Sequence, residues 1–164
     1  MQSTPHPTAP TPPHNGYALT KVRRAGGDET QRFDAVLTLD GQPVAHVSNG
    51  GEGGCNRWSP IDLDGWGAID EFNRYAMAWN STGEFAGIED GDQLVNRLLE
   101  VDRFNRMRSL AFVLDGADFW TTGEYAVLRG ATPAQTLEAL RSAVYAHRQP
   151  RVWSKTVGDF MPVG

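Results

Sequence analysis

The segment that constrains the fold most is an alternating stretch followed by a tight turn, residues 32–49, which reads "RFDAVLTLDGQPVAHVSN". In its first half, apolar residues recur at every second position and so share one face of a strand: Phe33, Ala35, Leu37 and Leu39. "DGQ" at 40–42 is a hairpin turn of the Asp-Gly kind, and "PVAHVSN" at 43–49 returns as the second strand. The sequence therefore predicts an antiparallel hairpin, preceded by a strand at 17–25.

Beyond residue 59 the apolar spacing changes from two to three or four, which is typical of a helix. A helix is therefore predicted within residues 59–80, with Asp62 or Asp64 capping its start. The residues predicted to form its inner face are Trp66, Ile69, Phe72, Ala76 and Trp79.

The rest of the chain continues with alternating helix and strand patterns. The predicted elements are a helix at 92–108, strands at 109–116 and 124–130, a helix at 132–149 and a strand at 151–157. Thr132 and Gln135 predict a capping box at the start of the helix at 132–149, whose inward residues are Leu137, Leu140 and Val144. The order βββααββαβ indicates an α+β fold, with a largely antiparallel sheet covered by helices.

The first sixteen residues differ from the rest in composition. "MQSTPHPTAPTPPHNG" contains five prolines and no aspartate, glutamate, lysine or arginine. This composition predicts a disordered, proline-rich tail over residues 1–16. The remaining residues, 17–164, have the length of one domain, since domains commonly contain about 100–150 residues. We therefore expect a single α+β domain after the tail.

Charge and cysteine content narrow the classes of partner. The net charge of −5 argues against a general binder of phosphate backbones and disfavours nucleic acid as a partner. The single cysteine cannot form an internal disulfide, which predicts a cytoplasmic protein. No apolar run approaches the roughly 18–20 residues that span a bilayer, so no membrane partner is expected.

The glycine-rich loop that follows the hairpin, "SNGGEGGCNRW" at 48–58, is the predicted functional site. Glycines bring backbone N–H groups close to a ligand and allow the positive φ angles of an anion-binding nest. The predicted ligand-binding residues are Asn49, Gly51, Gly53, Gly54, Asn56, Arg57 and Trp58. The structural interpretation comes first: a tight turn in which Asn49 and Asn56 hydrogen-bond a strained backbone, on which the ligand role would be built.

No catalytic residue, metal site or cofactor is predicted. Cys55 is a weak candidate for a nucleophile, with His46 as its base, but a lone cysteine beside a strand is more typically a small buried hydrophobe. The acidic segment 83–92, "GEFAGIEDGD", is either a solvated loop or a docking surface for a basic partner.

The hairpin and the glycine loop together resemble a loosely defined group of uncharacterised small proteins from bacterial chromosomes, plasmids and phages. The residues that carry this resemblance are Phe33, Ala35, Leu37, Asp40, Gly41, Val44, Val47, Asn49, Gly51, Gly53, Gly54 and Asn56. The sequence departs from the pattern at Gln42, where lysine is common in that group. The resemblance implies a hairpin-led α+β domain from mobile-element genomes, with no established activity.

Two functional hypotheses follow. The first is a non-enzymatic accessory protein of phage or mobile-element type that binds a host protein, for example to inhibit a defence system, or binds a small anionic ligand. The alternative is an enzyme or a sequestering protein for a nucleotide or a phosphorylated small molecule, with the loop at 49–57 as its cradle. A nucleic-acid binder that uses Arg57, Trp58 and Arg74 is disfavoured by the net charge.

Overall fold

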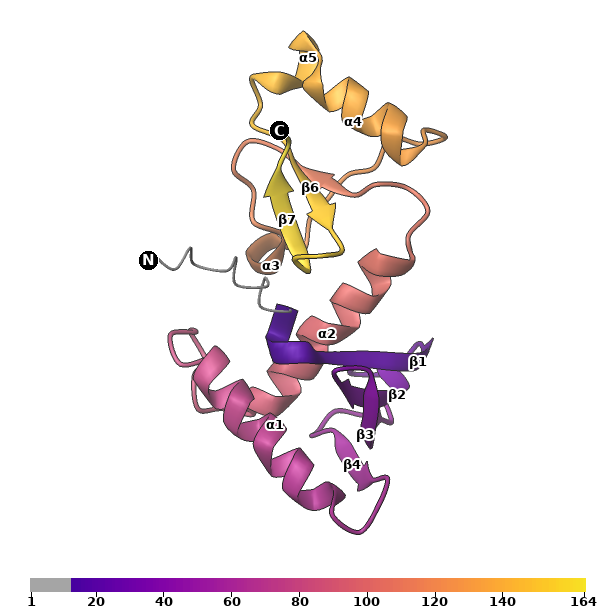
Figure 1. Cartoon of the computed structure of the whole chain (residues 1–164), viewed down its shortest axis with the longest axis vertical. Coiled ribbons are helices and arrows are strands. Elements are labelled where there is room, and N and C mark those ends of the chain that lie inside the picture. Colours follow the sequence, from indigo (N-terminus) through magenta and orange to yellow (C-terminus); the bar gives the residue numbers. More distant parts are fainter. Residues whose placement is uncertain (1–12) are drawn as a thin grey trace, which may run out of the picture.

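The computed structural model describes residues 13–164, so most of the predicted tail, residues 1–12, lies outside the described residues. The predicted α+β class is confirmed: helices accompany two antiparallel sheets, one of four strands and one of three. Figure 1 shows the four-stranded sheet at one end of the molecule and the three-stranded sheet toward the other, with a long helix between them. The prediction of one sheet is therefore corrected to two.

The four-stranded sheet contains the predicted hairpin. Its strands are β1 (Tyr17–Ala25), β2 (Arg32–Leu39), β3 (Gln42–Asn49) and β4 (Arg57–Pro60), in that spatial order and all antiparallel. Asp40 and Gly41 have φ values of 49° and 81°, the two positive values that a two-residue hairpin turn needs. β4 was not predicted, because four residues between a loop and a helix are too few to show alternation.

Helices α1 (Gly65–Trp79) and α2 (Asp90–Arg106) pack on one face of this sheet. The predicted helix at 59–80 begins later because its first residues form β4. On its predicted inner face, Ile69, Phe72 and Ala76 are buried, but Trp66 is 57% exposed. The side chain of Trp66 therefore lies largely outside the core, although the helix begins against the sheet at the buried Gly65.

The three-stranded sheet consists of β5 (Phe112–Val113), β6 (Arg151–Ser154) and β7 (Asp159–Pro162), in the order β5-β6-β7. The predicted strand at 109–116 shrinks to β5, and the predicted strand at 124–130 to an isolated bridge between Phe112 and Ala126. The aromatic connection between them forms the short helix α3 (Phe119–Thr122). β7 was not predicted.

The predicted helix at 132–149 is two helices, α4 (Pro133–Arg141) and α5 (Ala143–Ala146). The capping box of Thr132 and Gln135 is confirmed. The break lies at Ser142, whose ψ of 161° is extended, and it leaves Val144 69% exposed instead of facing inward.

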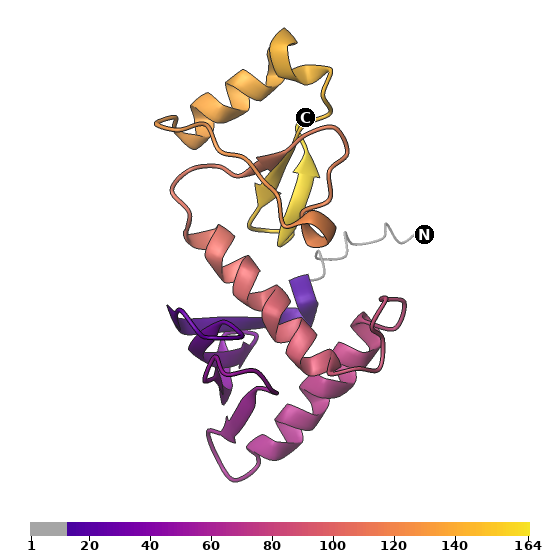
Figure 2. The same cartoon turned by 180° about the vertical axis from the view of Figure 1, so that it is seen from behind.

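Helix α2 contributes to two separate hydrophobic cores. Its first half packs in the core under the four-stranded sheet through Leu94, Val95, Leu98 and Leu99. Near its end, Phe104 packs in the second core, where its ring stacks on Trp153 with 4.6 Å between centroids. Figures 1 and 2 show α2 reaching from one sheet toward the other.

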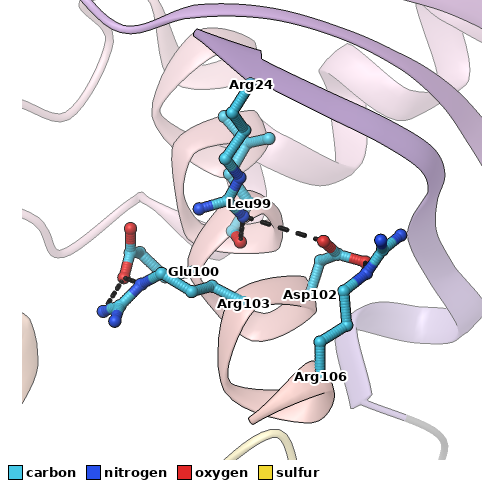
Figure 3. A network of polar contacts seen from close by, with 6 residues as sticks. All are labelled: Arg24, Leu99, Glu100, Asp102, Arg103 and Arg106. Atoms are coloured by element: carbon cyan, nitrogen blue, oxygen red, sulfur yellow. Dashed lines mark hydrogen bonds and ion pairs between the residues drawn. The ribbon is translucent and has the colours of Figure 1, made fainter. Parts of the chain in front are cut away.

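Polar contacts of α2 reinforce this arrangement on both sides. Toward the first sheet, Arg24 of β1 donates to the carbonyl oxygen of Leu99 and lies 3.7 Å from Asp102 (Figure 3). Toward the second, the guanidinium of Arg97 lies 3.1 Å from the centroid of the Trp120 ring and 3.8 Å from Asp159. Burial lowers the pKa of Arg97 to about 10, so the guanidinium stays charged at neutral pH.

The last four residues of the predicted tail belong to the folded part of the chain. Pro13–Gly16 form a short 3₁₀ segment, η1. The carbonyl oxygen of Gly16 accepts the N–H of Asp40 at 2.9 Å, and the ring of His14 meets that of Trp79 edge-on. Among the helices of residues 13–164, none has the length and apolar character needed to cross a membrane.

Candidate functional site

The side chain of Asn49 organises the glycine-rich loop. It is 9% exposed, and its Oδ1 accepts the N–H of Gly51 at 2.9 Å and the hydroxyl of Thr30 at 3.0 Å. Its Nδ2 donates to the carbonyl oxygen of Gly54 at 3.2 Å and to Oδ1 of Asn56 at 3.1 Å. One buried amide thus holds the loop at both ends, which matches the structural interpretation of this segment.

Gly51 has no room for a side chain. Its φ is +79°, and a Cβ there would lie 2.7 Å from the Cα of Gly27 and 3.1 Å from the carbonyl oxygen of Thr30. Its own carbonyl accepts the N–H groups of Glu29 at 3.0 Å and Thr30 at 3.3 Å. The glycine is therefore required by close packing against the turn between β1 and β2.

Acidic side chains lie close to the loop, alongside the bordering Arg32 and Arg57. A Cβ on Gly53 would lie 2.5 Å from Oε2 of Glu29, and the N–H of Asn56 donates to Oδ2 of Asp92 at 3.0 Å. Burial raises the pKa of Asp92, and Glu52 projects from the loop as an exposed side chain. An incoming phosphate would meet these carboxylates, and the N–H groups of Gly51 and Asn56 are already bonded.

The predicted ligand-binding residues do not converge on one point. Asn49, Gly51, Gly53, Gly54 and Asn56 lie together in the loop. Trp58 points into the first core and lies 5.3 Å from the ring of Phe72, centroid to centroid. Arg57 precedes Trp58 on β4, so its exposed side chain lies on the opposite face of the sheet.

Cys55 is exposed, so its predicted burial is wrong. β4 begins only at Arg57, and Cys55 therefore lies in the loop, outside the alternating pattern of the strand. Its thiol donates to Oε1 of Glu89 at 3.3 Å. That hydrogen bond, together with the negative charges of Glu89 and Asp92, raises the pKa of the thiol, which makes it a poor nucleophile at neutral pH.

The structure does not bring His46 to Cys55. His46 is exposed on β3, between the buried Ala45 and Val47, so it projects from the face of the sheet opposite to the helices. Cys55 instead contacts the residue that precedes α2. The pair predicted as nucleophile and base is therefore not assembled.

Cys55, Glu89 and Asp92 place three atoms that can bind a cation within 4.8 Å of one another. Acidic side chains at the start of a helix have an ordinary structural explanation, because they complement its dipole. Both Cys55 and Glu89 are exposed, and their contact with each other accounts for their position.

A cavity of about 330 Å³ lies between η1, β1, α2 and the turn after β6. Its apolar wall includes Leu19, Leu98 and Val101, and its polar groups include Asn105 and Lys155. None of the predicted site residues lines it.

Three large apolar side chains are exposed in the turn between β4 and α1, residues 61–64, and at the start of α1. Leu63 is 99% exposed, Trp66 57% and Ile61 43%. We call these residues the apolar turn. Trp66 was predicted to face inward from its helical spacing. The sequence feature that could have indicated the exposure of Leu63 is its position between two aspartates in "SPIDLDGW".

The apolar turn is held by its own hydrogen bonds. Oδ1 of Asp62 accepts the N–H of Asp64 at 3.1 Å, and the carbonyl oxygen of Asp62 accepts the N–H of Gly65 at 3.1 Å. Gly65 is packed against the sheet, since a Cβ there would lie 2.4 Å from the Cβ of Pro60. Asp62 thus closes the turn, and Asp64 occupies the N-cap of α1 without a capping hydrogen bond from its side chain.

A second exposed apolar group lies at the other end of α1: Met77 in the helix, and Phe85 and Ile88 in the loop between α1 and α2. The predicted acidic segment runs from this loop into α2. Its Asp90 is buried and accepts from Nδ2 of Asn80 at 2.7 Å and from the N–H of Gly87 at 3.1 Å. Asp90 therefore holds the loop in place and is not a solvated acid.

Comparison with known protein families, curated proteins and solved structures finds no match for this chain. The functional argument therefore depends on the geometry above.

Proposed function

We propose that this protein acts by binding a protein partner through the apolar turn, without catalysing a reaction. In the mobile-element setting that the hairpin resemblance implies, the partner is a host protein, for example a component of a defence system. The observation that carries the proposal is the exposure of Leu63, Trp66 and Ile61 on one short, hydrogen-bonded turn.

Burying the exposed apolar side chains of this turn against a partner would be favourable in free energy. Full burial of a leucine side chain is worth about 1.5–3 kcal/mol, and the isolated chain leaves that contribution unused at Leu63. Tryptophan is enriched among the residues that dominate binding energy. Because the turn is already closed by Asp62 and Gly65, association would require little further ordering of the backbone.

The charges beside the apolar turn indicate the chemistry of the partner. Asp62, Asp64 and Asp70 are exposed and form no ion pair within residues 13–164. An apolar pocket with lysine or arginine at its rim would match both the side chains and the charges of the turn.

The alternative, a nucleotide or phosphate site in the glycine loop, has less support. Two of the loop amides that such a site needs are bonded to Asn49 and Asp92, and acidic side chains lie close to the loop. The raised pKa of the Cys55 thiol also speaks against covalent catalysis there.

The test uses a photo-crosslinking amino acid placed at position 63, in the full chain produced in its host cell. Position 144 is the matched control, because Val144 is also an exposed aliphatic residue, 69% accessible, but lies in α5. We expect one protein to be crosslinked from position 63 and not from position 144. Its purified form should lose about 30-fold in affinity for Leu63→Ser, which corresponds to a hot-spot effect of about 2 kcal/mol.

Leu63→Ser should leave the melting temperature unchanged, because exposed substitutions usually alter stability by less than about 0.5 kcal/mol. Val144→Ser should retain full affinity. Equal crosslinking from both positions, or equal affinities of the two serine variants, would contradict the proposal. A second copy of the chain as the crosslinked species would contradict the host partner.

A further inference from the structure

The face of the four-stranded sheet opposite to the helices carries several exposed basic side chains. α1 and α2 pack on the inner face, so the other face of β1 to β4 carries the outward residues of each strand. The strand register aligns four of them in one row across the sheet. On neighbouring strands, Arg23 lies opposite Asp34, Asp34 opposite Ser48, and Ser48 opposite Arg57. An arginine therefore stands at each edge of the row.

Two further cations border this row. Lys21 lies in the bulge of β1 between Thr20 and Arg23, and Arg32 begins β2. Lys21, Arg23, Arg32 and Arg57 are all exposed, and none of them forms an ion pair within residues 13–164. We call these four residues, with Asp34 among them, the basic sheet face.

The neighbouring arginine on β1 lies in a different environment. Arg24 follows Arg23 on β1 and so points to the inner side, where it contacts Leu99 and Asp102 of α2 (Figure 3). Arg103 and Arg106 are likewise paired with acids on α2. The guanidinium groups of the basic sheet face, by contrast, have no protein partner in the described residues.

Hydroxyl groups lie among these cations. A second row across the sheet aligns Thr20, Val36, His46 and Ser59. A hollow of about 310 Å³ on this face is lined by residues of both rows, including Arg23, His46 and Ser48. Arginine, lysine and serine or threonine hydroxyls are the side chains that commonly contact phosphate and sugar oxygens in nucleic-acid complexes.

We propose that the basic sheet face binds the phosphate backbone of a nucleic acid, without reading its bases. The aromatic ring in β4, that of Trp58, points into the core, so the outward residues of the four strands include no phenylalanine, tyrosine or tryptophan ring on which bases stack. The inference is independent of the apolar turn, which lies on a different part of the chain.

The net charge of the chain does not decide this question. A net charge of −5 sums over all faces, whereas a polyanion meets only one face within a Debye length of about 10 Å at 0.1 M salt. On the basic sheet face, four cations stand against one carboxylate.

The experiment measures binding of the full chain to a fluorescent 20-residue oligo-dT and to a duplex of the same length, by anisotropy at increasing salt. Four phosphate contacts predict a log–log slope of roughly −3 for the single strand, or about a 50-fold loss of affinity between about 50 and 200 mM salt. The duplex should give a steeper slope, because its counterions are more strongly condensed.

The variant Arg23→Gln with Arg57→Gln should halve the slope, so that the loss over the same salt range falls to about 7-fold. Arg74→Gln with Arg129→Gln is the matched control: it removes the same charge from two exposed arginines outside this sheet. Asp34→Asn should tighten binding, a gain that a merely structural role would not produce.

Three outcomes would overturn the inference. These are no binding of either nucleic acid at 50 mM salt, equal slopes for the two double variants, and equally tight binding of poly-glutamate of matched charge. The last result would assign the face to an acidic protein instead. None of them bears on crosslinking from position 63.

Discussion

At the scale of single residues, packing explains why the loop is rich in glycine. Four glycines around one acid resemble an anion cradle in composition, but Asn49 and the turn before β2 occupy the groups that a ligand would use. The requirement for glycine at position 51 is a steric one, as the distance to Gly27 shows.

Gly51→Ala should therefore destabilise the protein by about 2 kcal/mol or more, from the positive φ and from the clash with backbone atoms. Gly50→Ala is the control, since its φ is not positive and a Cβ there meets no atom within 4 Å. Chemical denaturation should show Gly50→Ala within about 1 kcal/mol of wild type. Similar losses for both variants would show that the close packing at Gly51 is not the cause.

Cys55 supplies a second prediction at this scale. Because Glu89 raises the pKa of the thiol, less of it is thiolate at a given pH than for an ordinary cysteine. Glu89→Gln removes that charge, lowers the pKa and should increase the rate of alkylation by iodoacetamide at pH 7.5 several-fold. Glu84→Gln, which changes an exposed acid of the same loop, should leave the rate unchanged; an equal increase there would refute the role of Glu89.

At the scale of elements, α2 is the helix on which the arrangement depends. Its apolar residues recur at the spacing of one helical face, which the sequence itself shows, and four of them are buried: Leu94, Val95, Leu98 and Leu99. That its last turns belong to a different core was not predictable, because the helical pattern does not state which sheet a given turn faces. The ring of Phe104, in these last turns, contacts the rings of Phe119, Trp153 and Phe160.

Phe104→Ala should cost about 3–5 kcal/mol, the usual loss for a buried phenylalanine. Because Phe104 contacts only the second core, we expect hydrogen exchange to accelerate mainly at the amides of β6 and β7, through local opening. The matched variant Phe72→Ala, in the first core, should instead accelerate exchange in β2 and β3. Equal acceleration of both sheets by either variant would mean that the two cores open as one unit.

At the scale of the whole molecule, the fold separates features that the composition averages. Acidic side chains and exposed apolar ones occur together at the turn before α1, while unpaired cations gather on the open face of the sheet. The two proposals use these two surfaces, one for a basic protein partner and one for a nucleic-acid backbone. They can succeed or fail separately.

The sequence by itself determined the features that depend on neighbours a few residues apart. These are the hairpin and its Asp-Gly turn, the capping box at Thr132, and the buried stripe of α2. Only the tertiary structure decided the rest: that there are two sheets, that Cys55 and Leu63 are exposed, and that Arg23 and Arg57 share a row. Such facts depend on strand register and on which layer covers which face, and these are set by contacts between residues far apart in the chain.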